Sequence, residues 1–214
     1  IAKYLYKNLK LELSEEKTLI THTEKPASFL GYSIAVAKSN HTKRTDKGFL
    51  RKSVNKRVIL NIPKGMMKRK LLEYGAVKIT VHNGTERWKP NARVAFINND
   101  DLEILSRYNA EIRGFYNYFS LANNCGELHH FKYIMEYSMY KTFARKYRTS
   151  VAKICKQYKK DGVFTIAYTN SKNRRKEIVF YNKGFKRLNP NNDSKYDNFP
   201  DVSFCFGKTN LIDR

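Results

Sequence analysis

Three short patterns in this 214-residue chain contain residue types that could carry out covalent or metal chemistry. Ser14-x-x-Lys17 has the spacing of an acylating serine–lysine pair, but the companion motifs S-D-N and K-T-G are missing. Gly207-Lys208-Thr209 resembles the end of a phosphate-binding loop, but Val202 stands where the earlier glycine is required. His129 and His130 are adjacent and would point about 100° apart on a helix, so they are poor joint ligands for a metal ion.

Asp100 and Asp101 form a fourth candidate, a carboxylate pair for a cation. They stand where a long helix is expected to begin, so capping and the helix dipole explain them better than a metal does. Cys125, Cys155 and Cys205 are far apart and form no C-x-x-C pair, which favours reduced thiols over a zinc site. The sequence therefore contains no recognisable complete active site, and we expect no cofactor or metal in this chain.

Lysine and arginine point to a different chemistry, the binding of phosphate. The net charge is +23, and two blocks account for it. Residues 38–70 contain twelve Lys or Arg and one acid, and residues 141–187 contain fifteen and two. The alternative interpretation is a solvated surface, because most charged runs in proteins simply face water. The size of this excess and its confinement to two blocks favour a nucleic acid instead. No apolar run reaches the ~18 residues of a membrane span, so we expect no membrane partner.

Two long helices are predicted to position these basic residues. The first begins near Asn99, and its core-facing residues recur at helical spacing: Leu105, Tyr108, Ile112, Phe115, Phe119 and Ala122. A polar stripe lies beside them, formed by Asn109, Arg113 and Asn117. The second runs from about Glu127 to Tyr158 with an interruption near Thr149-Ser150. It has one buried stripe (Leu128, Phe131, Met135, Ser138 and Thr142) and one basic stripe (Lys141, Arg145 and Arg148). A helix from Pro63 to Gly75 would complete a three-helix bundle.

Strands are predicted on both sides of these helices. The alternation of residues 9–13 is typical of a half-buried strand. Residues 29–34 read as one strand in which Gly31 marks a bulge or a close backbone approach. Further strands are expected at 18–21, at 58–60, around the Asn83-Gly84 turn, and in a hairpin of 163–169 with 177–181. The fold class is therefore α+β.

Three patterns, in the right order and spacing, resemble one known family. Residues 11–18, 20–22 and 29–34 (L-E-L-S-E-E-K-T, I-T-H and F-L-G-Y-S-I) resemble the last two conserved blocks of the reverse transcriptase domain in group II intron-encoded proteins. The middle of the chain resembles their maturase domain, also called domain X or the thumb. The matching residues are Leu102-Glu103-Ile104, Tyr108-Asn109, Arg113-Gly114, Asn117-Tyr118, Tyr137-Ser138, Lys141-Thr142, Ala144, Lys146 and Tyr147. The final basic hairpin occupies the place of the family's DNA-binding region.

The resemblance implies four segments. Residues 1–40 would be the end of the reverse transcriptase palm with its primer-grip region, and residues 41–62 a basic linker. Residues 63–160 would be the maturase or thumb domain, and residues 161–214 the basic DNA-binding region. The expected architecture is thus a β-rich end of a palm, a three-helix thumb bundle and a tail that contains a basic β-hairpin.

The resemblance also implies three sets of site residues. The primer-grip-like set is Phe29, Leu30, Gly31 and Tyr32. The RNA-binding set is Asn109, Arg113, Asn117, Tyr118, Lys141, Arg145, Lys146 and Arg148. The DNA-binding set is Lys172, Arg174, Arg175, Lys183, Lys186 and Arg187.

The family's polymerase signature, Tyr-x-Asp-Asp, is missing from these 214 residues. We therefore expect no nucleotidyl transfer by this chain alone, and we assign the catalytic Mg²⁺ to a longer parent protein. Neither paired cysteines nor HNH-like histidines follow Asp201, so no nuclease domain is recognised.

The family's members are RNA-directed DNA polymerases that help their intron RNA fold, splice and insert into DNA. The expected partners are therefore group II intron RNA and target DNA, in a bacterial cytoplasmic or an organellar ribonucleoprotein. A homodimer of the parent protein stays open. So does a second function, that of a stand-alone structural RNA-binding protein such as a ribosome-associated factor.

Overall fold

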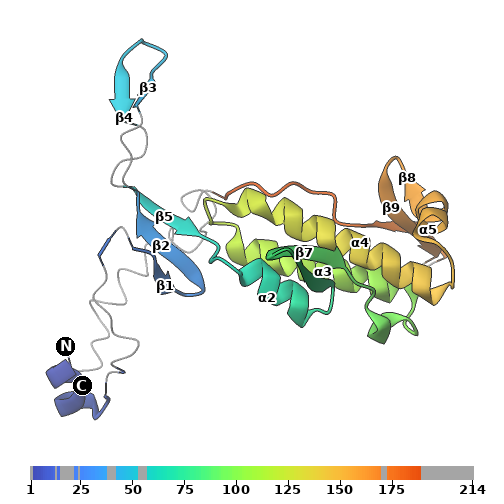
Figure 1. Ribbon diagram of the computed structural model, residues 1–214, viewed down its shortest axis with the longest axis horizontal. Coiled ribbons are helices and arrows are strands. Elements are labelled where there is room, and N and C mark those ends of the chain that lie inside the picture. The colour runs from blue at the N-terminus through green and yellow to red at the C-terminus, as the bar shows by residue number, and fades with distance from the viewer. Residues whose placement is uncertain are drawn as a thin grey trace. The chain divides into compact units, whose positions relative to one another are not determined.

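The computed structural model describes residues 2–12, 14, 22–23, 25–37, 42–52, 57–169 and 173–188. The chain divides into two compact units, Ile1–Pro63 and Lys64–Arg214 (Figure 1). Both helices and strands are present, which confirms the predicted α+β class. In the described part of the chain, no helix combines the length and the apolar character that crossing a bilayer requires.

The first unit is built mainly from short antiparallel strands. β1 (Ala27–Phe29), β2 (Tyr32–Val36) and β5 (Val58–Asn61) form a sheet in the order β1-β2-β5. β3 (Thr42–Arg44) pairs with β4 (Leu50–Lys52) as a separate hairpin. Two short helical turns, α1 (Ala2–Tyr4) and the π-helical η1 (Leu5–Leu9), come before the strands.

Two strand predictions for this unit are wrong. Leu9 ends η1, and residues 10–12 belong to no strand. Residues 29–34 are not continuous, because Leu30 (φ 47°) and Gly31 (φ 72°) form a two-residue turn between β1 and β2. Positive φ at both central residues is typical of a type I′ hairpin turn, and Gly31 therefore lies in a turn and not in a bulge. The predicted strand at 18–21 lies outside the described residues.

The second unit contains the long helices and two hairpins. Its helices are α2 (Met66–Glu73), α3 (Asp101–Phe119), α4 (Leu128–Lys146) and α5 (Val151–Tyr158), with 3₁₀ turns η2 (Val94–Phe96) and η3 (Cys125–Glu127). Its strands are β6 (Val77–His82), β7 (Thr85–Pro90), β8 (Lys159–Lys160), β9 (Val163–Thr169) and β10 (Arg175–Val179). β6 pairs with β7, and β9 pairs with both β8 and β10, all antiparallel.

Local chemistry explains where the helices begin. The Asp100 side chain accepts a hydrogen bond from the backbone N–H of Leu102 at 3.0 Å, as an N-cap residue does. Ser150 caps α5 in the same way, so the predicted interruption at Thr149-Ser150 is confirmed. α2 begins at Met66, three residues later than predicted, because Gly65 adopts a left-handed conformation (φ 80°) just before it.

The core of this unit lies between the helices. α2 and α3 both pack against α4, and every residue of the two predicted core stripes is buried. The rings of Phe115 on α3 and Phe131 on α4 stack with centroids 4.5 Å apart. Burying one such side chain contributes about 1.5–3 kcal/mol. Phe164 of β9 contacts the rings of Phe143 and Tyr158, which fastens the β9–β10 hairpin to α4 and α5.

Candidate nucleic-acid interface

A pocket of about 330 Å³ lies between the C-terminal half of α3 and the chain that follows β10. Its lining residues are Asn109, Arg113, Tyr116 and Asn117 from α3, and Val179, Tyr181, Asn182 and Lys183 from the other side. The pocket therefore brings together three residues predicted to bind RNA and one, Lys183, predicted to bind DNA.

Asn109 joins the two walls of this pocket. Its Nδ2 group donates a hydrogen bond to the carbonyl oxygen of Val179 at 2.8 Å, and its Oδ1 atom accepts one from the backbone N–H of Tyr181 at 2.8 Å. The side chain is 7% exposed. Both ends of its amide are thus occupied by backbone, and Asn109 positions the pocket wall.

Further hydrogen bonds hold residues 181–188 along α3 and the turn after it. Tyr116 Oη donates to the carbonyl of Lys186 at 2.8 Å, and Arg187 Nε donates to that of Leu121 at 3.0 Å. The Leu188 N–H donates to the Ser120 carbonyl at 2.8 Å. Contacts on both sides of Lys183 therefore fix its backbone near Arg113.

The groups at the pocket mouth can bind an anion that also carries hydrogen-bonding groups. Arg113, Asn117 and Lys183 are exposed, and in the described part of the chain their side chains have no hydrogen bond or ion pair. Burial and the neighbouring Tyr116 raise the pKa of Tyr181, and Arg113 offsets part of that rise. The Tyr181 hydroxyl consequently stays protonated at neutral pH and can donate. Two cations, two amides and a phenol suit phosphate, sugar and base edges.

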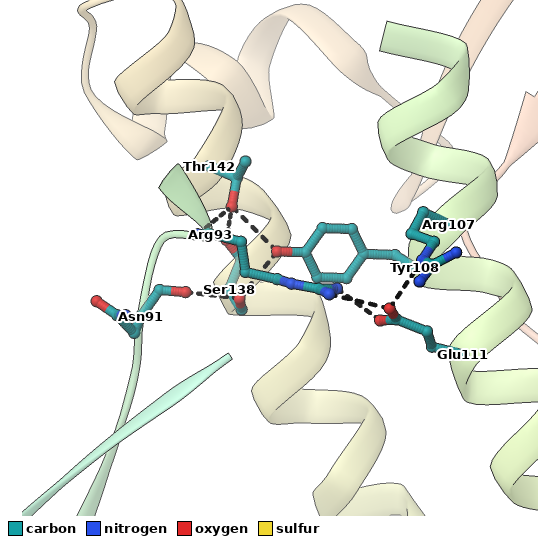
Figure 2. Close-up of polar contacts among 7 residues, drawn as sticks. All are labelled: Asn91, Arg93, Arg107, Tyr108, Glu111, Ser138 and Thr142. Atoms are coloured by element: carbon teal, nitrogen blue, oxygen red, sulfur yellow. Dashed lines mark hydrogen bonds and ion pairs between the residues drawn. The ribbon is translucent and has the colours of Figure 1, made fainter. Parts of the chain in front are cut away.

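A buried polar network fixes the connection between β7 and α3 (Figure 2). Arg93 makes two hydrogen bonds with Glu111, from Nη1 at 2.5 Å and from Nη2 at 2.9 Å, and both side chains are 8% exposed. The Arg93 guanidinium also lies over the ring of Phe96, 4.2 Å from its centroid. Such a pair ties the connection firmly to α3.

Hydroxyl groups complete the network on α4. Tyr108 Oη lies 2.9 Å from Ser138 Oγ and 3.0 Å from Thr142 Oγ1. Ser138 Oγ donates to the carbonyl of Asn91, and Thr142 Oγ1 accepts from the backbone N–H of Arg93. The connection, α3 and α4 are therefore held in one arrangement, which fixes the helix that carries Arg113 and Asn117.

The basic residues of α4 divide into two groups. Lys141 Nζ donates to the carbonyl of Pro90 at 2.7 Å, and Lys146 Nζ binds the Asn99 carbonyl and the Asp101 carboxylate, each at 2.6 Å. These two lysines thus help to hold the β7–α3 connection. Arg145 and Arg148 are exposed, and their side chains have no such partner among the described residues. Tyr118, on α3, is 54% exposed.

The remaining predicted site residues lie in separate places. Arg174 and Arg175 are exposed at the start of β10, and Lys172 lies outside the described residues. Lys186 and Arg187 lie beside the end of α3 and not on that hairpin. Phe29 and Leu30 are 61% and 72% exposed at the β1–β2 turn of the first unit, with Gly31 and Tyr32 next to them.

Four pocket residues were not predicted from the sequence: Tyr116, Val179, Tyr181 and Asn182. Tyr116 lies between the matching pairs Arg113-Gly114 and Asn117-Tyr118, and that position was a usable signal. Tyr181 and Asn182 offer no local signal, because hydrogen bonds from residues far away in the sequence, such as those of Asn109, bring their segment to α3. Across the described residues, no group of three or more His, Cys, Asp or Glu side chains is placed to hold a metal ion.

Comparison with known proteins places this geometry in context. A family model described as type II intron maturase matches residues 55–212. The group II intron-encoded protein LtrA of Lactococcus lactis subsp. cremoris is 41% identical over 157 residues, which cover 73% of this chain and 26% of that protein. A COX1/OXI3 intron 1 protein of Saccharomyces cerevisiae is 35% identical over 148 residues, 66% of this chain and 17% of that protein. The chain thus spans about a quarter or less of these relatives.

Proposed function

The chain belongs to the type II intron maturase family, and on that premise we propose that its second unit binds group II intron RNA and thereby supports splicing and intron mobility. The observation that carries the proposal is the α3 pocket. It gathers Arg113, Asn117 and Lys183 at one opening, and their side chains have no partner among the described residues. The match to the maturase family does not favour the alternative, a stand-alone structural RNA-binding protein.

The proposed mechanism separates affinity from selectivity. Lys and Arg would supply most of the affinity through phosphate contacts, which carry no sequence information. Asn117, Tyr181 and Tyr118 would reach sugars or unpaired bases, which are the parts of a folded RNA that proteins read. The Figure 2 network would hold α3 rigid, so that little ordering is required when RNA binds.

Further roles follow from the family. We propose that the helices of the second unit act as the thumb of a longer reverse transcriptase, and that the basic β9–β10 hairpin contacts target DNA. Residues 29–32 would act as the primer grip. The nucleotidyl transfer reaction and its Mg²⁺ would belong to the parent protein.

Arg113→Ala should weaken binding of the intron RNA about tenfold or more while the melting temperature stays nearly unchanged. A hydrogen bond to a charged group contributes about 1.5–3 kcal/mol, and 1.4 kcal/mol corresponds to a factor of ten. Arg113 is exposed and has no described partner within the chain, so its loss should leave the fold intact. Filter binding of the 214-residue chain to its intron RNA, with a thermal melt of each variant, measures both quantities.

Arg107→Ala is the matched control, because Arg107 is an exposed arginine on the same helix but outside the pocket. It should leave RNA affinity unchanged. If Arg113→Ala instead lowers the melting temperature while the folded fraction binds RNA normally, Arg113 has a structural role and the pocket is not the RNA site.

Replacing both Arg174 and Arg175 by Ala should reduce the salt dependence of binding to duplex DNA. Each neutralised phosphate contributes about 0.7–0.9 to the slope of log affinity against log salt, so the slope should flatten by about one to two. The helical core should stay folded, because both residues are exposed at a hairpin end. Equal affinity and equal slope for wild type and variant would show that this end is a solvated surface.

A further inference from the structure

The β6–β7 hairpin has one face made entirely of basic and hydroxyl- or imidazole-bearing residues. The strand register places Lys78 opposite Lys89, Thr80 opposite Arg87, and His82 opposite Thr85. Residues that face each other across two antiparallel strands, and those two apart on one strand, share a face. Five of these six residues are exposed, and Thr80 is half-buried. We call these six residues the hairpin face.

Part of the opposite side of the hairpin packs against the helices. Val77 is buried, and the ring of Trp88 lies 5.6 Å from that of His130 on α4. Glu86, the sole acid in residues 77–90, is also on this side. It accepts hydrogen bonds from Lys68 Nζ at 2.5 Å and Trp88 Nε1 at 3.3 Å. The acid is therefore neutralised away from the hairpin face, and the hairpin is fixed with that face toward solvent.

The three cations of the hairpin face have no countercharge among the residues that the structure describes. In the described part of the chain, the side chains of Lys78, Arg87 and Lys89 make no ion pair and no hydrogen bond. Like charges directly opposite each other on antiparallel strands are destabilising, and Lys78 and Lys89 form such a pair. A bound polyanion would remove that repulsion. The hairpin face therefore suits a polyanionic ligand.

We propose that the hairpin face binds the backbone of double-stranded RNA, at a site separate from the α3 pocket. The proposal rests on the proposed function in assuming that the chain binds intron RNA. Proteins that bind single strands stack bases on aromatic rings. The hairpin face, all of it described, contains no Phe, Tyr or Trp, because Trp88 lies on the packed side. What it offers is a pair of antiparallel strands with cations and donors, which suits a duplex backbone.

RNA fits this surface better than DNA does. An A-form duplex displays its 2′-hydroxyls along a wide, shallow minor groove, where proteins recognise it by shape and backbone contacts. Thr80 and Thr85 can each donate to and accept from a 2′-hydroxyl, and they alternate with the cations across the two strands. Phosphate contacts from Lys78, Arg87 and Lys89 would supply the affinity.

The test uses the full 214-residue chain and a blunt RNA duplex of about 20 base pairs, long enough to present two minor grooves. The variant Lys78→Gln/Arg87→Gln/Lys89→Gln should flatten the slope of log affinity against log salt by about two to three, since each phosphate contact contributes about 0.7–0.9. Lys132→Gln/Lys153→Gln/Lys156→Gln, the control, removes equal charge elsewhere on the helices and should change the slope little. The Lys78→Arg/Lys89→Arg variant should retain the wild-type slope.

The outcomes separate this site from the pocket. If the hairpin variant binds duplex RNA with the same slope as the control, the hairpin face is a solvated surface and the inference is wrong. If the variant loses duplex DNA binding as strongly as duplex RNA binding, the preference for RNA is wrong. If wild type binds no RNA at all, the proposed function fails as well. Two separate sites are supported if the hairpin variant no longer binds duplex RNA, but adding Arg113→Ala to it still weakens its binding of intron RNA as much as in wild type.

Discussion

Arg93→Met or Glu111→Leu alone should lower the free energy of unfolding by about 3–5 kcal/mol, whereas the two changes together should restore most of the loss. Both side chains are 8% exposed and hold each other by two hydrogen bonds. Removing Glu111 leaves the buried Arg93 charge unpaired, and removing Arg93 leaves the buried Glu111 with only the exposed Arg107 as a partner, so both changes are costly. Replacing both by apolar residues of similar size is often neutral. Urea unfolding of wild type, the two single variants and the double variant measures this double-mutant cycle. The slope of unfolding free energy against urea concentration should be the same for all four proteins.

Arg107→Met tests the other ion pair of Glu111. Its Nε lies 3.1 Å from Glu111 Oε1, but the arginine side chain is 65% exposed. An exposed pair of this kind contributes about 0–1 kcal/mol. A loss from Arg107→Met as large as that from Arg93→Met would contradict the argument from burial. So would a double variant as unstable as the sum of its two single changes, because the residues would then not act as a pair.

Helical periodicity was enough to predict one buried stripe along each of the two long predicted helices. All the residues of both predicted stripes are buried, because helix geometry brings residues three or four apart to one face without any information from elsewhere in the chain. The caps at Asp100 and Ser150 and the Asn83-Gly84 turn are equally local signals. The Leu30-Gly31 turn was missed because a leucine rarely takes a positive φ, and the apolar pattern runs on through it.

Only one wall of the candidate site could be predicted, because only that wall follows a local period in the sequence. The spacing of Asn109, Arg113 and Asn117 placed them on one helix face, but the other wall of the pocket comes from a segment about seventy residues later in the chain. No period in the sequence encodes that contact. Arg93 was likewise missed, because a single arginine in a stretch of short strands and loops looks like any surface residue until Glu111 and Phe96 enclose it.

Asn109→Leu should destabilise the second unit by about 1–3 kcal/mol for each of the two backbone groups that it leaves unpaired. The lost partners are the carbonyl of Val179 and the N–H of Tyr181, both bound at 2.8 Å. Leucine has the same number of side-chain heavy atoms and the same branching, so the change leaves no cavity and the loss reflects hydrogen bonding. Residues 179–181 should then move away from α3, and the Tyr181 amide should exchange its hydrogen much faster than in wild type. Intron RNA affinity should fall with it.

Asn117→Leu distinguishes positioning from direct contact, because Asn117 lines the same pocket but is exposed and its side chain has no described partner within the chain. This change should cost at most about 0.5 kcal/mol in stability, as surface substitutions do. It should still weaken RNA binding without altering Tyr181 exchange. Both variants would thus bind RNA more weakly, but only Asn109→Leu would also lose stability. If Asn109→Leu leaves stability and exchange unchanged but abolishes RNA binding, Asn109 contacts the RNA itself, and its hydrogen bonds to the backbone do not hold the pocket.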